Sequence, residues 1–152
     1  MFKKLPILLS FAFILLTLTA CSREDDIEEI FTGKTWYMSG AKINGLELNS
    51  EVSNFYTNAG EGAYYITFSS SIFNGELSDG NTFAGTWSAD GKHQTVSLHF
   101  TTLPNSDTTF DQQLRSILTS IRSYSSGAYF LQLKQDGSNI IYLSDTRSKV
   151  IN

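Results

Sequence analysis

Two patterns of apolar residues follow one another along this chain. Before residue 103, apolar side chains alternate with polar ones, as at Val96, Leu98 and Phe100. A period of two residues places every second side chain on the same face of a strand. The sequence therefore predicts strands at 33–43, 46–48, 63–70, 71–77, 81–89 and 93–102.

Turn signals separate these strands. Asn44-Gly45 and Asp90-Gly91 are dipeptides that favour tight β-hairpin turns. Residues 49–62 are rich in Asn, Ser, Gly and Glu, which is typical of an irregular loop. We expect Trp36 to be the main apolar anchor of the first strand.

The second pattern is helical. From residue 107 to 124 the large apolar residues are spaced by four, three, one, three and three positions, at Phe110, Leu114, Ile117, Leu118, Ile121 and Tyr124. This spacing places them on one face of an α-helix. Thr109 and Gln112 have the spacing of a capping box, and Asp107 is a competing N-cap. Asp111 in the first turn and Arg122 in the last suit the helix dipole.

Alternation returns after Gly127 and predicts a closing β-hairpin. Its strands are 128–134, with Tyr129, Leu131 and Leu133 on one face, and 139–145. The fold class predicted is mainly β: an antiparallel sheet curled into a small barrel, with one amphipathic helix (about 107–124) before the C-terminal hairpin. The helix is expected to cover an open end or gap, because its apolar stripe needs a partner.

Residues 1–20 have the pattern of a secretory signal. Lys3 and Lys4 precede an apolar run that is shorter than the roughly 20 residues of a membrane-spanning helix. The following Leu18-Thr19-Ala20-Cys21 resembles a bacterial lipobox, which implies cleavage before Cys21 and acylation of that residue. Two or more acyl chains anchor a protein stably in a membrane. The alternative is an ordinary signal peptide followed by a chance cysteine.

The residues after Cys21 are strongly acidic. Glu24, Asp25 and Asp26 are followed by Glu28 and Glu29, and such a block predicts a solvated tether over residues 21–31. The folded domain is then expected at 32–152. Acidic residues in this position also resemble the surface-export signal of Bacteroidetes lipoproteins. That resemblance implies a cell-envelope protein anchored to the outer membrane and exposed on its outer face.

Charge and composition exclude several functions. Loss of Lys3 and Lys4 with the signal leaves 9 basic against 15 acidic residues, a net charge of −6. Without a Lys/Arg cluster, this acidity argues against nucleic acid and leaves Cys21 as the expected link to the membrane. If Cys21 is acylated, no thiol remains for a disulfide or a metal site.

No catalytic residue, metal ligand or cofactor is predicted. His93 and His99 are six residues apart on one expected strand, a separation of roughly 20 Å. Glu76 and Asp79 are interpreted as solvated loop residues rather than as a pair of catalytic carboxylates. Three tyrosines expected to be exposed could stack on a glycan, although scattered surface aromatics explain them equally: Tyr56, Tyr65 and Tyr142.

The segment Asp79–Trp87 is interpreted as a structural corner. Gly80 and Asn81 tolerate a positive φ, which a sharp turn requires. Gly85 leaves a gap in the strand face, as at a bend or a close backbone approach. Phe83 and Trp87 are expected to bury large aromatic area on one side of the strand.

Residues 64–92, with this corner at their centre, resemble the core of the META domain of bacterial envelope lipoproteins. The residues that carry the resemblance are Gly33-Lys34-Thr35-Trp36, Asn81-Thr82-Phe83-Ala84-Gly85 and Asp90-Gly91. It extends over about 33–145, but Asp79 and Gly80 replace the usual Gly and the frequent Cys of the corner. Gly33-x-x-Trp36 also loosely resembles the opening of a lipocalin-like barrel.

Three classes of function remain open from the sequence. The first is an envelope lipoprotein with a non-catalytic binding or structural role toward an envelope protein or a glycan. The second is a lipocalin-like carrier of a small apolar ligand, which requires a barrel not filled by Trp36, Phe68, Phe83 and Trp87. The third is an envelope enzyme or an inhibitor of one.

Overall fold

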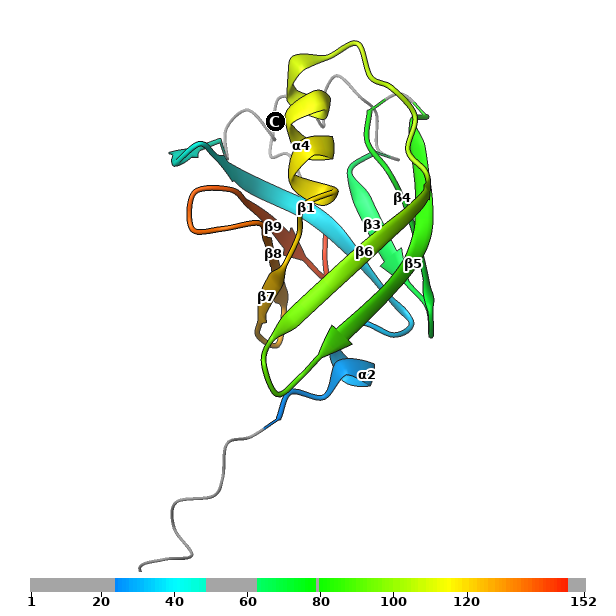
Figure 1. Ribbon diagram of the computed structural model, residues 1–152, viewed down its shortest axis with the longest axis vertical. Coiled ribbons are helices and arrows are strands. Elements are labelled where there is room, and N and C mark those ends of the chain that lie inside the picture. Colours follow the sequence, from blue (N-terminus) through cyan, green and yellow to red (C-terminus); the bar gives the residue numbers. More distant parts are fainter. Residues whose placement is uncertain (1–23, 49–62, 79, 148–152) are drawn as a thin grey trace, which may run out of the picture.

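The structure is a computed structural model that describes residues 24–48, 63–78 and 80–147 (Figure 1). Its elements follow in this order: α2 (Ile27–Ile30), β1 (Lys34–Ile43), β2 (Leu46–Glu47), β3 (Tyr65–Phe68), β4 (Ile72–Glu76), β5 (Thr82–Asp90), β6 (Thr95–Thr102), α4 (Thr109–Leu118), β7 (Ser123–Ser126), β8 (Phe130–Lys134) and β9 (Ile140–Ser144). No helix in these ranges has the length and apolar character needed to cross a bilayer.

The strands form a closed antiparallel barrel of eight strands with β2 as an extra strand, which confirms the predicted fold class. Strand β1 closes it by pairing on both edges. Its first half pairs with β3, from Lys34↔Phe68 to Tyr37↔Tyr65. Its second half pairs with β9, and the register shifts between Met38 and Gly40. The bulge changes the direction of the long strand β1, so that it can pair with β3 along its first half and with β9 along its second half.

The weakest junction of the barrel lies between β6 and β7. Their only Cα partners are Thr95 and Ser123, flanked by backbone hydrogen bonds such as Val96 N to Arg122 O at 3.2 Å. Helix α4 lies over the upper part of the barrel on this side (Figure 1). The apolar side chains of the helix complete the core there: Phe110, Leu114, Ile117 and Leu118.

The helix is shorter than predicted. It covers Thr109–Leu118 rather than 107–124, and its N-cap is Thr108, whose Oγ1 accepts from Asp111 N, rather than Thr109 or Asp107. The Thr119 hydroxyl donates to the Arg115 and Ser116 carbonyls at 2.9 and 3.1 Å and competes for the acceptors at the helix end. Tyr124, which was predicted to lie in the helix, lies in strand β7 instead. Its side chain is buried in the core, so its position in the sequence continues the helical spacing of apolar residues by coincidence.

Aromatic rings fill the barrel. Phe31, Trp36 and Phe68 are each at most 1% exposed. The Phe31 ring lies 5.0 Å from the rings of both Phe68 and Trp87 and 5.2 Å from that of Tyr124. Eight strands enclose a space that side chains can just fill, and in the described residues they do so.

The turn at Asn44-Gly45 is the two-residue turn that was predicted, whereas the turn after β5 is longer than predicted. Asn44 and Gly45 both have positive φ, 51° and 83°, as a two-residue turn between antiparallel strands requires. The turn after β5 is longer than the predicted Asp90-Gly91 hairpin, because Asp90 still pairs with Thr95 across the ladder. Its Oδ1 accepts from Lys92 N at 2.9 Å, which stabilises the wider loop.

Candidate functional site

The corner predicted at residues 79–87 is built from a turn and a close strand contact. Gly80 has a φ of 77°, whereas Asn81 does not have a positive φ. The turn is held by Asn81 N donating to Ser78 O at 2.9 Å and by Gly80 N donating to Glu76 Oε1 at 3.1 Å. Glu76 therefore acts within the turn, and Asp79 lies outside the described residues.

Gly85 lies at a close backbone contact between β5 and β6. A Cβ atom on Gly85 would be 2.0 Å from the carbonyl oxygen of His99, and the register shifts between Ala84 and Gly85. Phe83 and Trp87 are both buried, and Trp87 Nε1 donates to Ser69 O at 2.8 Å. These contacts define a packing and turn element at this corner.

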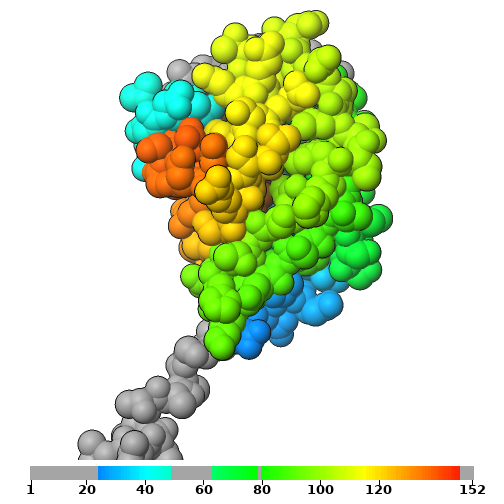
Figure 2. All heavy atoms as spheres, in the orientation of Figure 1, coloured from blue at the N-terminus to red at the C-terminus, as the bar shows by residue number. Residues whose placement is uncertain are grey.

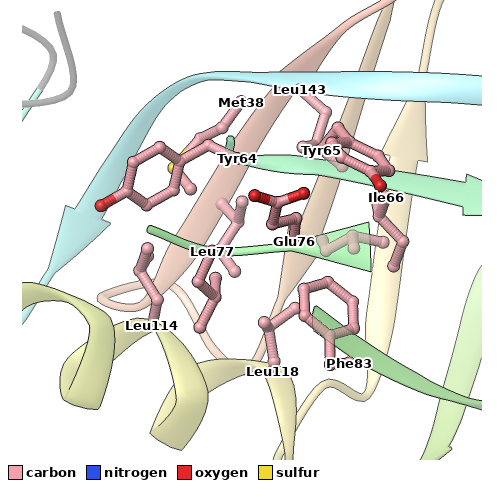
Figure 3. Close-up of a pocket in the computed structure, with 12 residues that line it drawn as sticks. Met38, Tyr64, Tyr65, Ile66, Glu76, Leu77, Phe83, Leu114, Leu118 and Leu143 are labelled. Atoms are coloured by element: carbon pink, nitrogen blue, oxygen red, sulfur yellow. The ribbon is translucent and has the colours of Figure 1, made fainter. Parts of the chain in front are cut away.

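A small apolar cavity lies among the described residues of the barrel interior. It has a volume of about 20 Å³ and lies under α4 (Figure 3). A single water molecule occupies about this much space. Its lining is almost entirely apolar: Met38, Tyr64, Tyr65, Ile66, Glu76, Leu77, Phe83, Leu114, Leu118, Leu133, Ile141 and Leu143. A small-molecule ligand does not fit in this cavity.

A fully buried carboxylate, that of Asp111, lies close to the same end of the barrel. Asp111 is 0% exposed. Its Oδ1 accepts from Tyr64 Oη at 2.9 Å. Its Oδ2 accepts from the backbone and the hydroxyl of Ser78 and from Ser106 Oγ at 3.2 Å. A buried carboxylate is tolerated only when its oxygens are satisfied in this way.

This polar cluster fastens the first turn of α4 to the ends of β3 and β4. Tyr64 takes part with a φ of 57°, an unfavourable conformation for a bulky residue. Sequence reasoning placed Asp111 correctly in the first helical turn but missed its burial. The partners of Asp111 come from three separate loops, which local sequence patterns do not bring together. The only local indication that Asp111 is buried was its position next to the apolar Phe110.

The N-terminal segment, residues 24–31, packs onto the opposite end of the barrel. Asp25 N donates to Gly91 O at 3.2 Å. Asp25 Oδ2 accepts from Tyr124 Oη and from Gln94 Nε2, both at 3.0 Å. Phe31 is 0% exposed. The described part of the predicted tether is therefore attached to the barrel, because apolar side chains lie among its charges.

An open groove of about 600 Å³ follows this segment. One wall consists of acidic side chains from residues 24–29, and the other of Ser126, Gly127 and Ala128 from the β7–β8 turn. Lys34 and Trp36 also line the groove, with Lys34 Nζ 5.6 Å from the centroid of the Trp36 ring. The groove is open and predominantly polar.

The histidines do not converge on a site. His93 lies in the β5–β6 turn rather than in a strand, and its Nδ1 is 2.7 Å from Asp90 Oδ2. That hydrogen bond raises the pKa of His93 and lowers the pKa of Asp90. His99 is exposed on β6 and lies 3.3 Å from Ser97 Oγ. Within the described ranges no three His, Cys, Asp or Glu residues are grouped as a metal site.

The aromatic surface differs from the prediction. Tyr65 and Tyr142 are partly buried. Tyr142 Oη donates to Glu47 Oε1 at 2.9 Å, and burial followed by this bond raises the pKa of Tyr142. Tyr56 lies outside the described residues. The exposed pair is Tyr129 and Phe130, at 73% and 46%; Tyr129 precedes β8 and so does not share the inward face of Leu131 and Leu133.

Comparison with known proteins identifies a different family from the one that the corner motif suggested. The model of a domain of unknown function, DUF4847, matches residues 22–144. A crystal structure of a DUF4847 family protein from Bacteroides vulgatus covers 82% of this chain and 100% of its own, with 24% identity and a TM-score of 0.66. Among curated proteins no sequence matches.

The META assignment is therefore wrong. The residues that carried it, Gly33–Trp36 and Asn81–Gly85, serve general needs of a small antiparallel barrel. An early tryptophan anchors the core, and a glycine permits close approach of two strands.

Proposed function

The chain belongs to the DUF4847 family, and from that premise we propose that it is a lipid-anchored protein of the bacterial cell envelope with a non-catalytic binding or structural role. The observation that carries this proposal is the filled interior of the barrel. Trp36, Phe68, Phe83 and Trp87 all face inward and are at most 9% exposed. Binding therefore takes place on the outer surface, toward an envelope protein or a glycan.

The charged and polar groups support a non-catalytic role. The buried carboxylate of Asp111 has both oxygens occupied by donors of the protein itself. The His93–Asp90 pair is exposed in a turn, with no nucleophile among its recorded partners. General acid–base chemistry needs a titratable group in reach of a bound substrate, and neither arrangement offers that geometry.

The filled interior of the barrel also argues against the hypothesis of a small-ligand carrier. Sites for small ligands usually have volumes of roughly 300–1,000 Å³, whereas the cavity under α4 measures about 20 Å³. An apolar ligand would have to displace the aromatic core. Titration with a long-chain fatty acid is expected to leave the fluorescence of Trp36 and Trp87 unchanged, and saturable quenching would restore the carrier hypothesis.

The anchoring proposal is supported by the sequence before residue 24. The lipobox-like Leu18–Cys21 follows an apolar run, and acidic residues follow Cys21. The similar crystal structure comes from a Bacteroides species, which agrees with a Bacteroidetes-type export signal. We place the protein on the outer membrane, with its barrel at the cell surface.

The experiment that tests this proposal is metabolic labelling with a fatty acid in the native host. The full-length protein is expected to incorporate label and to fractionate with the outer membrane, whereas the Cys21→Ser variant is expected to do neither. Protease added to intact cells is expected to degrade the wild-type barrel. Unlabelled wild-type protein, or a Cys21→Ser variant that stays in the membrane fraction, would contradict the anchor.

Cross-linking in intact cells tests the binding role. A reagent that reaches the cell surface is expected to join the wild-type protein reproducibly to one envelope component, protein or glycan. The Cys21→Ser variant provides the control, because it has the same barrel surface without the proposed anchor. Absence of any reproducible partner at native expression would count against the binding role.

A further inference from the structure

The position of the N-terminal segment determines how far the barrel can move from its anchor. The described chain begins at Glu24, at the end of the barrel that carries α2 (Figures 1 and 2). The helix α4 lies at the opposite end (Figure 1). A lipid attached close to residue 24 would therefore hold one particular end of the barrel toward the membrane.

Hydrogen bonds of Asp25 attach the segment to the β5–β6 turn and to strand β7. Its backbone and side chain make three hydrogen bonds, to Gly91, Gln94 and Tyr124, at 3.0 to 3.2 Å. A Cβ atom on Gly91 would lie 2.2 Å from the Asp25 carbonyl oxygen. Only glycine at position 91 allows this approach of the two backbones.

The remainder of the segment packs against the hydrophobic core of the barrel. Ile27 and Ile30 pack against the core, and Phe31 is fully buried within it. Trp36 Nε1 donates to Ile30 O at 3.3 Å, which ties the end of α2 to β1. The segment therefore moves with the barrel, and residues 24–31 do not contribute length to a tether.

The covalent reach of the anchor is correspondingly short. Cys21 and Glu24 are three residues apart, and an extended chain spans at most about 3.6 Å per residue, or roughly 11 Å. A free tether over residues 21–31 would reach roughly 35 Å by the same rule. The headgroup layer on each side of a bilayer is about 5–8 Å thick, so the end of the barrel next to Glu24 is held at the headgroups.

We propose that the α2 end of the barrel is a membrane-contacting surface, formed by the N-terminal segment and by the exposed aromatic pair Tyr129 and Phe130, where the β7–β8 turn leads into β8. This inference rests on the proposed lipid at Cys21. Residues 126–128 of this turn form one wall of the groove whose other wall is the N-terminal segment. Tyrosine suits a membrane interface, because its ring is apolar and its hydroxyl stays hydrated.

Charge selects the kind of lipid surface. Glu24, Asp26, Glu28 and Glu29 are exposed on the N-terminal segment, and they would be repelled by an anionic surface. The contact is therefore with neutral or zwitterionic headgroups, through aromatic side chains rather than through basic residues. The opposite end, with α4 and the loop before it, is directed away from the membrane.

Fluorescent labels on single cysteines test the orientation. The lipidated protein, purified from its membrane, has its only native cysteine blocked, so Tyr129→Cys introduces one reactive thiol. Asn105→Cys, in the loop between β6 and α4, is the matched control at the far end. In phosphatidylcholine vesicles that carry a headgroup quencher, we expect the label at 129 to be quenched several-fold more than the label at 105. Equal quenching would overturn the proposal.

Release of the segment provides a second test. Gly91→Val forces the Asp25 backbone away, and Phe31→Ala in the same variant removes the apolar attachment, so that about seven more residues of chain are freed. The expected result is that quenching at position 129 falls to the level at position 105, while the far-ultraviolet circular dichroism still reports a folded barrel. A label at 129 that remains preferentially quenched in the folded variant would show that the N-terminal segment does not hold this end at the membrane.

Mass spectrometry separates failure of this inference from failure of the proposed anchor. A bare Cys21 would contradict the anchor but leave the geometry testable, because the thiol can be coupled to a maleimide lipid in phosphatidylcholine vesicles. Hydrogen exchange is then expected to slow at residues 126–130 relative to the uncoupled protein and to stay unchanged at residues 103–108. Slowing at both ends, or at neither, would overturn the proposed surface. A partner protein that protects residues 126–130 in place of lipid would also overturn it.

Discussion

The hydroxyl of Tyr124 donates a hydrogen bond to Asp25 Oδ2 over 3.0 Å, across 99 positions of sequence. This bond joins the segment that precedes the barrel to β7, the strand after the helix. The Tyr124 ring also meets the Phe31 ring at 5.2 Å. One residue thus holds the N-terminal segment at two points, one polar and one apolar.

The first prediction is that Asp25 and Tyr124 are energetically coupled. Hydrogen bonds to charged groups contribute about 1.5–3 kcal/mol, and less where they are partly exposed. We expect Asp25→Ala and Tyr124→Phe each to lower the free energy of unfolding by about 1–2 kcal/mol. The double variant should lose less than the sum of the two, because both changes remove the same bond.

Denaturant unfolding of the four proteins measures this coupling. Glu28→Ala is a suitable control, because Glu28 is acidic, exposed and in the same segment but has no recorded side-chain hydrogen bond. It is expected to change stability by less than about 0.5 kcal/mol. Strict additivity of the two single changes would show that the bond contributes nothing.

A second prediction concerns the ionisation of Tyr124. Burial, and then the hydrogen bond to Asp25, raise the pKa of Tyr124 well above its ordinary value of 10.0. A group with a raised pKa stabilises the fold fully below its unfolded pKa and loses that contribution as the pH rises toward the folded one. The stability that Tyr124 provides should therefore be complete at neutral pH and decline above pH 10.

Tyrosinate absorbance checks this second prediction. The native protein is expected to ionise fewer tyrosines than its denatured form just above pH 10, because the pKa values of both Tyr124 and Tyr142 are raised, and Tyr124→Phe should reduce that difference without abolishing it. Asp25→Asn should lower the pKa of Tyr124 toward its ordinary value, because the second cause of the shift is gone. An unchanged titration in the Asn variant would assign the shift to burial alone.

A third prediction concerns the buried carboxylate. Asp111→Ala removes the acceptor of Tyr64, Ser78 and Ser106 at once, and each buried donor left without a partner costs about 1–3 kcal/mol. We expect a loss of at least about 3 kcal/mol, measured by denaturant unfolding. Asp107→Ala, an exposed neighbour, should be near neutral. A small effect at Asp111 would mean that water replaces the carboxylate.

The sequence predicted the barrel and all of its described strands except β7, because their signal is local. Alternation at Val96 and Leu98 depends only on neighbouring positions, and both side chains are buried as expected. The helix boundary was wrong because the inward-facing Tyr124 continued the helical spacing into β7 by coincidence. A pattern of apolar positions alone does not distinguish a helix from a strand when both face the same core.

Features built from distant residues could not be read from local patterns. Phe31 follows a run of acidic residues in the sequence, so the charge of the segment concealed its burial. Asp111 was explained by the helix dipole, although its three partners lie in other loops. The close approach at Gly85 was expected from the glycine, but its partner, the His99 carbonyl, depends on the register of β5 and β6.

A fourth prediction uses that close approach. Gly85→Ala would place a Cβ 2.0 Å from the His99 carbonyl oxygen, so two paired strands must separate. Overpacking of this kind costs about 1–3 kcal/mol. Gly137→Ala is the matched control, because a Cβ there meets nothing within 4 Å; it should be neutral or stabilising by up to about 1 kcal/mol. Equal thermal midpoints would show that the strands adjust without cost.

The last prediction is a pH effect in the β5–β6 turn. The hydrogen bond with Asp90 raises the pKa of His93 above 6.5, and the same bond lowers the pKa of Asp90 below 3.8. The contribution of His93 is complete below pH 6.5 and is lost as the pH rises through its folded pKa. That of Asp90 is complete above pH 3.8 and is lost as the pH falls. The pair is therefore strongest between these two values.

Nuclear magnetic resonance of the two imidazole rings tests this last effect directly. His93 is expected to titrate at a higher pH than a free histidine, and Asp90→Asn should return its pKa to about the ordinary value. His99 lies on β6, away from the turn, so its resonances should not respond to the Asp90→Asn substitution. Since both members of the pair are exposed, salt should weaken the shift. A His93 pKa that the Asn variant leaves unchanged would show that Asp90 is not its partner in solution.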